Sequence, residues 1–271
     1  MKTANASPAF LNPPLLNPPL KWAGGKRWLV PMLMDFWQPY SHQRLVEPFV
    51  GGMAVALGLQ PRQAVLNDHN LHLINFYRWL QKGLCIDIPL ENSAEYYYGC
   101  RERFNQLIRD GQANSLESAK LFYFMNRTGY NGLCRFNNGN QFNVPFGRYK
   151  TINYIRDFTG YASVLRSWQF TSGDFSAIPI FPGDFIYSDP PYDVKFTRYS
   201  AQDFKWQDQV RLAEWLAAHP GPVVASNQAT DRILNLYQSL GFEIIFINAP
   251  RRISCTGDRS PAKEVLAYKG I

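Results

Sequence analysis

The sequence predicts an α/β fold in which helices cover both faces of a mostly parallel sheet and a mainly helical segment interrupts it. Two observations predict this fold. Apolar stretches of strand length alternate with amphipathic helical stretches from residue 154 to the C-terminus. Two further strand-like stretches, at 44–52 and 63–70, precede a long helical region. The 271 residues suffice for one large domain that carries a smaller insert.

The N-terminal part predicts an arm followed by two strands. Residues 1–19 are rich in proline and contain most of a direct repeat, LNPPL at 11–15 and at 16–20, so we expect an extended arm. RLVEPFVGG (44–52) indicates a buried strand that enters a glycine turn, and QAVLNDHN (63–70) indicates a strand with a polar end. A helix is expected over 71–81.

The middle of the chain changes character near residue 127. Residues 93–110 and 116–127 place apolar side chains three and four positions apart, which predicts two helices. Residues 127–150 are rich in Gly, Asn and aromatics and contain no Asp or Glu. We therefore expect a loop or hairpin made for contact, with the cations Arg127, Arg135, Arg148 and Lys150.

Strand and helix patterns alternate in the C-terminal part. Helices are expected at 154–168, 207–219 and 231–241, and strands at 169–175, 184–192, 222–227, 242–249 and 264–269.

Composition and charge indicate which kinds of partner, metal site and membrane association the protein can have. The 28 Lys and Arg against 21 Asp and Glu give a net charge of +7, which weakly favours a polyanionic partner. Cys85, Cys100, Cys134 and Cys255 form no C-x-x-C pair and the four histidines follow no zinc pattern, so we expect reduced thiols and no metal. No apolar run approaches the ~20 residues of a membrane span, and no signal-peptide layout is present, so we expect a cytoplasmic protein without membrane contact.

The motif Asp189-Pro190-Pro191-Tyr192 follows the apolar stretch Phe185-Ile186-Tyr187, at the carboxyl end of a strand, where open α/β sheets bind ligands. Two prolines fix an extended backbone, so the Asp189 carboxylate and the Pro190 carbonyl can both accept hydrogen bonds from one amino group. That arrangement suits methylation of an amino nitrogen, with Tyr192 stacked on an extruded base. An isolated Asp-Pro-Pro can also be a simple turn. The two Asn-Pro-Pro-Leu copies in the arm follow no strand and receive no catalytic role.

Three weaker motifs indicate a cofactor. The turn Glu47-Pro48-Phe49-Val50-Gly51-Gly52 lets a backbone approach a nucleoside or amino-acid moiety closely. Asp68 stands where an acidic residue commonly binds a ribose, although a lone Asp is more often a helix cap. Lys21-Trp22-Ala23-Gly24-Gly25-Lys26 lacks the first glycine and the Ser/Thr of a phosphate loop, and suits an amino-acid end whose carboxylate meets Lys26.

Together, KWAGGK, EPFVGG, NDHN, NRTGYNGLCRFNNGNQFNVPFGRYK and SDPPY resemble the Dam family of DNA adenine methyltransferases, from Lys21 to the C-terminus. The resemblance implies a Rossmann-like S-adenosylmethionine-dependent sheet at 20–70 and 155–271. It also implies an inserted, mainly helical target-recognition domain with a β-hairpin at 71–154, after the arm at 1–19. The implied reaction methylates N6 of a flipped adenine in GATC. Thr128, where an aromatic is common, and the arm are departures from the family pattern.

The resemblance also implies roles for individual residues. Catalysis falls to Asp189, Pro190, Pro191 and Tyr192. The S-adenosylmethionine pocket is formed by Trp22, Ala23, Gly24, Lys26, Glu47, Phe49, Gly51, Asp68 and Asp189. In double-stranded DNA, Tyr130 would wedge into the duplex, Asn131 would face the orphaned base, Leu133 would meet a thymine methyl, and Arg135 and Lys21 would read guanines. Asn137, Arg148 and Lys150 would contact phosphates.

The expected reaction is a direct in-line transfer without a covalent intermediate, a metal or an obligate protein partner. Two alternatives stay open: a DNA-binding protein that has lost turnover, and a methyltransferase acting on RNA or a protein amide. The Arg- and Asn-bearing segment 127–150 favours duplex DNA, because A-form RNA hides its major groove.

Overall fold

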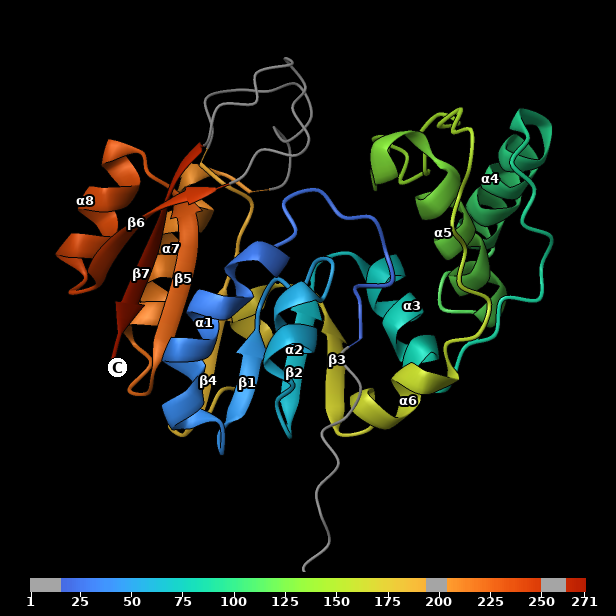
Figure 1. Cartoon of the computed structure of the whole chain (residues 1–271). Helices are drawn as coiled ribbons and strands as arrows, with labels where there is room; N and C mark the ends of the chain where they lie inside the picture. The colour runs from blue at the N-terminus through green and yellow to red at the C-terminus, as the bar shows by residue number, and fades with distance from the viewer. Residues whose placement is uncertain (1–15, 194–203, 250–261) are drawn as a thin grey trace, which may run out of the picture.

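A computed structural model describes residues 16–193, 204–249 and 262–271 of the chain. Most of the predicted arm, including the first LNPPL copy, and Cys255 lie outside the described residues. The described part contains a seven-stranded sheet in the order β3-β2-β1-β4-β5-β7-β6 (Figure 1). The strands are β1 (Arg44–Glu47), β2 (Ala64–Asp68), β3 (Trp168–Ser172), β4 (Asp184–Ser188), β5 (Val223–Gln228), β6 (Glu243–Ala249) and β7 (Ala262–Lys269).

Strands β1 to β5 pair in parallel, as the alternation of strands and helices predicts. The last strand differs, because β7 lies antiparallel between β5 and β6. The sequence predicts a strand at this position but not its direction or its place in the sheet. The result is a Rossmann-like sheet with one antiparallel strand.

Eight α-helices occur in the described part of the chain. They are α1 (Val30–Trp37), α2 (Ala54–Leu59), α3 (Leu71–Gln81), α4 (Ala94–Arg109), α5 (Leu116–Thr128), α6 (Thr159–Leu165), α7 (Trp206–Ala217) and α8 (Asp231–Ser239). Side-chain oxygens of Asn70, Ser93, Ser115 and Thr230 cap α3, α4, α5 and α8, which explains where these helices begin. Helices α1 and α2 are not predicted from the sequence, and α6 is shorter than the expected 154–168.

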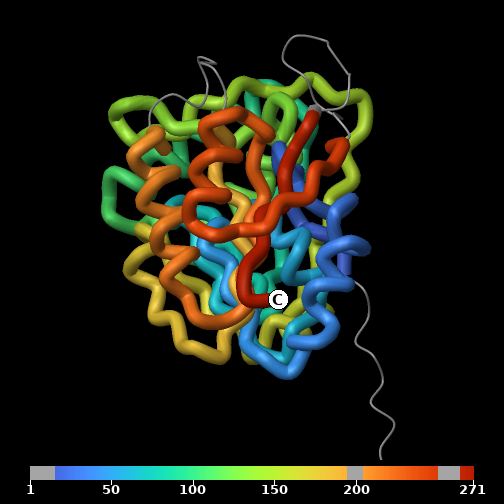
Figure 2. The backbone as a smooth tube through the Cα atoms, turned by 90° about the vertical axis from the view of Figure 1, so that its left-hand side faces the viewer, coloured from blue at the N-terminus to red at the C-terminus, as the bar shows by residue number. Residues whose placement is uncertain are grey.

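Alternate residues of the central strands point to opposite faces of the sheet. Leu45 of β1 and Phe185 of β4 join the apolar core that also contains residues of α1 to α3. Val46 and Ile186, their neighbours in the chain, join a second core with residues of α7 and α8. Figure 2 shows the orange helices α7 and α8 to one side of the sheet and the blue α1 to the other. The sheet is therefore buried on both faces, as expected for parallel strands.

Helices α4 and α5 lie between β2 and β3 in the chain and stand beside the sheet (Figure 1). Helix α3 packs on β2 and β3 as well as on α5. Because α3 touches both regions, the insert boundaries of 71–154 stay a prediction. The predicted hairpin is small: in 129–146 the described pairing consists of the isolated antiparallel bridges Phe136–Phe142 and Gly129–Phe146.

The described end of the arm lies against the body of the protein. Leu20 is buried, and the Tyr161 hydroxyl of α6 donates a 2.6 Å hydrogen bond to the Asn17 carbonyl. The second LNPPL copy is therefore anchored where it meets KWAGGK. None of the helices that the structure describes is both long and apolar enough to span a bilayer.

Candidate active site

Three carboxylates gather at the carboxyl ends of adjacent parallel strands. Glu47 ends β1, Asp68 ends β2, and Asp189 follows β4 directly. Strand β1 pairs with both β2 and β4, so the three strand ends lie side by side. All three residues line one cavity of about 1210 Å³. The structure thus brings the glycine turn, the predicted ribose-binding Asp and the DPPY motif together at the edge where open sheets bind ligands.

The Asp189 carboxylate is held by two neighbours. Lys26 Nζ lies 3.1 Å from Asp189 Oδ1, and the Ser226 hydroxyl donates a 2.7 Å hydrogen bond to the same oxygen. Lys26 is 6% exposed and also donates to the Gly24 carbonyl at 3.0 Å. A buried lysine that is hydrogen-bonded to a carboxylate restricts the rotamer of that carboxylate. The DPPY carboxylate is thus positioned before any ligand arrives.

Tyr192 has a partner that sequence reasoning misses. Its hydroxyl donates a 2.6 Å hydrogen bond to Glu264 Oε2, and Glu264 lies on β7. Lys26 Nζ lies 4.6 Å from the centre of the Tyr192 ring. Burial, followed by the negative charge of Asp189, raises the pKa of Tyr192 well above its ordinary value. The ring is therefore a neutral, oriented aromatic surface in the lining of the cavity.

The glycine turn is shaped by Trp22. A Cβ placed on Gly51 or on Gly52 would come within 2.8 Å of the Trp22 side chain. Gly51 also has a φ of 45°, donates its N–H to Asp68 Oδ2 at 3.1 Å, and accepts from the Tyr77 hydroxyl at 2.6 Å. Glycine is required here for a close approach and for the left-handed backbone. The KWAGGK and EPFVGG motifs therefore form one wall of the cavity.

Glu47 is an unusual carboxyl group. It is 2% exposed, and its Oε1 has no hydrogen-bond partner among the described residues. Burial raises the pKa of Glu47 well above its ordinary value, and the nearby Asp189 charge adds to this shift. An unpaired buried acceptor costs stability unless a ligand supplies a donor or a positive charge. This oxygen is therefore a candidate ligand contact.

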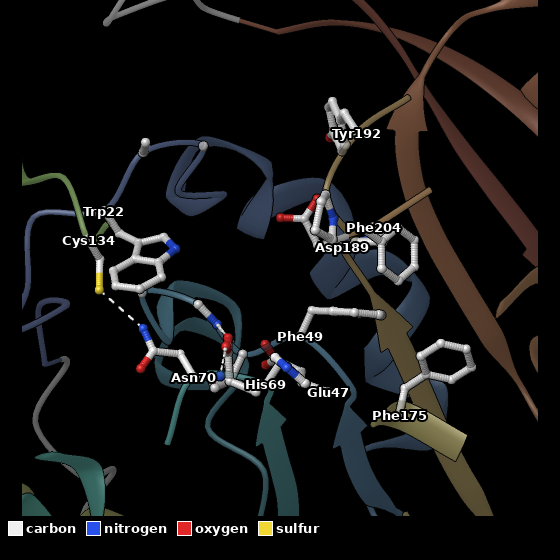
Figure 3. A pocket seen from close by; sticks show the side chains of 18 of the residues that line it. Trp22, Glu47, Phe49, His69, Asn70, Cys134, Phe175, Asp189, Tyr192 and Phe204 are labelled. Carbon is white, nitrogen blue, oxygen red and sulfur yellow. Dashed lines mark hydrogen bonds between the residues drawn. The ribbon is translucent and has the colours of Figure 1, made fainter. Parts of the chain in front are cut away.

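Asp68 connects the cavity to the segment 127–150. Its Oδ1 accepts the Asn70 N–H at 2.9 Å, and the Asn70 amide donates to Cys134 Sγ at 3.1 Å (Figure 3). Burial raises the pKa of Asp68 and raises that of Cys134 to about 12. A thiol with this pKa stays protonated near neutral pH and is a weak nucleophile. Cys134 therefore acts here as a packing and hydrogen-bonding group.

Figure 3 shows Trp22 and Cys134 on one side of the cavity and Asp189 and Tyr192 on the other. The cavity is also lined by an aromatic cluster in which the Phe49 ring lies 5.9 Å from Phe175 and 5.5 Å from Phe204. Phe175 and Phe204 are not among the predicted site residues. The cavity thus has both aromatic and charged residues in its lining, which suits a ligand with a planar base and charged groups.

The candidate DNA residues differ in how they are presented. Tyr130 is 50% exposed. Asn131 has a φ of 52°, so the backbone takes a left-handed conformation and turns at this residue. Leu133 is half-buried, whereas Arg148 and Lys150 are exposed. None of these five is among the residues that line the cavity, so the structure places them apart from the carboxylates.

Other candidate DNA residues contact their own chain. Arg135 donates through Nε to Asn143 Oδ1 at 2.7 Å, and Asn137 Oδ1 accepts from the N–H groups of Gly139 and Gln141. Lys21 Nζ donates to the Arg127 carbonyl at 2.8 Å. Arg135 and Asn137 line the cavity as well. No group of three or more His, Cys, Asp or Glu side chains in the described ranges could hold a metal ion.

The chain matches the model of the D12 class N6 adenine-specific DNA methyltransferase family over residues 22–253. The match covers the glycine turn, residues 127–150 and DPPY. One solved structure, a putative RNA methyltransferase from Pyrococcus horikoshii, has a TM-score of 0.39 and 9% identity over 87% of this chain and 81% of that chain. That likeness is too weak to carry a functional statement.

Three curated relatives are similar over most of this chain. The DNA N-6-adenine-methyltransferase of Escherichia phage P1 is 36% identical over 91% of this chain but only 34% of its own length. The Type II methyltransferase M1.LlaDCHI of Lactococcus lactis subsp. cremoris is 35% identical over 85% of this chain and 87% of its own. The DNA adenine methylase of Escherichia coli (strain K12) is 34% identical over 92% and 94%. This chain belongs to the D12 class of N6 adenine-specific DNA methyltransferases.

Proposed function

We propose that this chain transfers a methyl group from S-adenosylmethionine to N6 of an adenine flipped out of duplex DNA, within the sequence GATC. One observation carries the proposal. Asp189, positioned by Lys26 and Ser226, shares a cavity of about 1210 Å³ with Glu47 and Asp68, the other two strand-end carboxylates. A cavity of this size can hold a cofactor and a nucleobase together.

The residues of the cavity fit S-adenosylmethionine. This cofactor carries two positive groups, a carboxylate, a ribose and an adenine ring. Glu47 offers a buried, unpaired acceptor for a cationic group, and Asp68 stands at the strand end that suits ribose hydroxyls. Phe49 and its neighbours offer an aromatic surface for the ring. When bound, the cofactor supplies an electrophilic methyl group on its sulfonium.

The protein's part in the reaction is to hold and orient the amino group. The Asp189 carboxylate and the Pro190 carbonyl would each accept one N–H of the adenine amino group, which directs its nitrogen lone pair away from the ring. Tyr192, fixed by Glu264, offers its ring for stacking on the extruded base. Positioning of two reactants can lower a barrier by up to about 7–11 kcal/mol, so neither a metal nor a protein nucleophile is required.

The candidate recognition residues would read the duplex from the segment 127–150 and from Lys21. Exposed Tyr130 is suited to a wedge between base pairs, and the backbone turn at Asn131 presents that side chain beside it. Arg135 and Lys21 have the chemistry to read guanines, and Leu133 that to contact a thymine methyl. Asn137, Arg148 and Lys150 would bind phosphates, and the net charge of +7 favours such contacts.

The direct test incubates the protein with S-adenosylmethionine labelled in its methyl group and with DNA, RNA or protein. A random duplex library, mapped for modified bases, then reports the target. We expect label in duplex DNA alone, on N6 of adenine, in GATC. Label in RNA or protein with unlabelled DNA would contradict the proposed substrate, and methylated adenines outside GATC would contradict the proposed target.

A further inference from the structure

Asn126 lies in the last turn of α5 and joins two segments that are far apart in the sequence. Its Oδ1 accepts the Lys21 N–H at 2.9 Å, and its Nδ2 donates to the Lys21 carbonyl at 2.8 Å. The same Nδ2 donates to the Gly132 carbonyl at 3.3 Å. The side chain is 2% exposed. One buried amide therefore ties the backbone of Lys21 to the backbone of the loop 130–135.

The two segments are also in direct contact. A Cβ placed on Gly132 would lie 2.3 Å from Lys21 Cβ, so only glycine permits this approach, and Gly132 has a φ of 62°. Gly132 stands between Asn131 and Leu133 in the sequence. If Lys21 moves, the loop that carries Asn131 and Leu133 must therefore move as well.

The Lys21 side chain continues the same contact. Its Nζ donates to the Arg127 carbonyl at 2.8 Å and lies 3.7 Å from the centre of the Tyr149 ring. Both partners belong to the segment 127–150. The Lys21 side chain therefore contacts the segment 127–150, and Asn126 holds the Lys21 backbone.

We infer that Asn126 is a positioning residue that holds Lys21 and the loop 130–135 in a fixed position relative to each other. The residues that contact the two outer base pairs of the target are then kept at a fixed spacing. This inference rests on the proposed function, in which Lys21 and the loop contact bases. An amide is required because Asn126 donates two hydrogen bonds and accepts one. A carboxylate of the same shape would lose both donors and face two carbonyl oxygens.

The test compares Asn126→Asp with Asn105→Asp as a matched control. Asn105 is also a buried amide, 6% exposed, and it bridges α4 to Phe142 through bonds of 2.8 and 3.1 Å. The control thus removes a buried amide that holds the same segment at a different point, Phe142. Gly132→Ala is a second variant. It keeps Asn126, but its new Cβ would collide with Lys21 Cβ and push the loop away from Lys21.

Two readouts are measured without cofactor. Fluorescence anisotropy gives the binding ratio between a GATC duplex and duplexes changed at either outer base pair, and amide hydrogen exchange follows peptides that contain Lys21. In Asn126→Asp and in Gly132→Ala we expect the binding ratio between the GATC duplex and the changed duplexes to fall by about tenfold at both outer base pairs. We also expect faster amide hydrogen exchange in peptides that contain Lys21. In Asn105→Asp we expect discrimination within about twofold of the wild type.

Separate results would overturn the inference or the proposed function. Faster exchange at Lys21 with unchanged discrimination would show a clamp that does not position the readers, and would overturn the inference. Equal loss of discrimination in Asn126→Asp and Asn105→Asp would show a general structural effect, with the same consequence. If the wild type itself prefers no duplex, the proposed target fails, and hydrogen exchange still reports whether Asn126 holds the two segments together.

Discussion

The carboxyl edge of the sheet and the segment 127–150 are built in different ways. At the sheet edge, Glu47, Asp68 and Asp189 follow parallel strands whose hydrogen bonds fix their positions. In the segment 127–150 the regular pairing within the described part is limited to two isolated bridges. Tyr130 is half exposed, and Arg135 and Lys21 bind groups of their own chain.

Under the proposed function, the sheet edge carries out methyl transfer and the segment 127–150 recognises DNA. In the proposed reaction the Asp189 carboxylate needs no rearrangement to meet its substrate, because Lys26 and Ser226 already hold it. If Arg135 reads a base as proposed, it must exchange its hydrogen bond to Asn143 for one to a base edge when DNA binds. Changes at the sheet edge should therefore alter the rate of transfer, and changes in the segment should alter which duplex is bound.

The largest expected effect is at Asp189. Asp189→Ala removes one of the two proposed acceptors of the adenine amino group, so we expect single-turnover methyl transfer to fall by at least about a thousandfold. Duplex binding, measured by anisotropy, should stay within a few-fold of the wild type. Asp189→Asn controls for the loss of the partner of Lys26. Retained transfer in Asp189→Ala would refute the assignment.

A smaller effect is expected at Arg135. Arg135→Ala removes a proposed bidentate contact to guanine worth about 1–3 kcal/mol, which corresponds to roughly 5- to 150-fold in binding of the cognate duplex. Binding to a duplex that lacks this guanine should change little, so the discrimination between the two is lost. An equal loss for both duplexes would mean that Arg135 contacts phosphate instead.

The pH dependence of cofactor binding should depend on Glu47. Its pKa is raised by burial in the free protein, whereas a bound cationic cofactor favours the ionised form. Binding therefore releases a proton, and affinity should increase with pH, by at most about tenfold per pH unit, until Glu47 is ionised in the free protein. Calorimetry in two buffers should detect this proton for the wild type and not for Glu47→Gln. Equal proton release in both would exclude Glu47 as the titrating group.

The smallest effect is expected at Lys150, an exposed residue. As a proposed phosphate contact, it should contribute to every duplex alike. Lys150→Ala should weaken binding a few-fold for all sequences and lower the slope of log affinity against log salt by about one. A change confined to GATC duplexes would instead indicate that Lys150 reads a base.

Local sequence patterns predict the central elements well. The helix expected over 71–81 is found at Leu71–Gln81, because Asn70 caps it and its apolar residues keep a helical period. The strand before Asp189 ends at Ser188, which places DPPY at the sheet edge as expected. Elements with a strong local period and a clear cap are thus recoverable from the sequence.

Contacts that depend on strand order are not recoverable in this way. Glu264 reaches Tyr192 because β7 runs antiparallel beside β5, and Ser226 reaches Asp189 because β5 pairs with β4. Neither pairing is encoded in a local pattern. The polar pair Ser226-Asn227, which ends the predicted strand at 222–227, is a signal that could have identified Ser226. The role of the segment 127–150 follows from family resemblance and not from its periodicity.

The central claim is that Asp189 and the Pro190 carbonyl together receive the amino group of the adenine. The most direct measurement is a crystal structure of the protein with a GATC duplex and the demethylated cofactor product. We predict the adenine outside the duplex, with its amino nitrogen within about 2.7–3.2 Å of both oxygens and its ring against Tyr192. An adenine that remains stacked in the duplex, or one bound away from Asp189, would contradict the account.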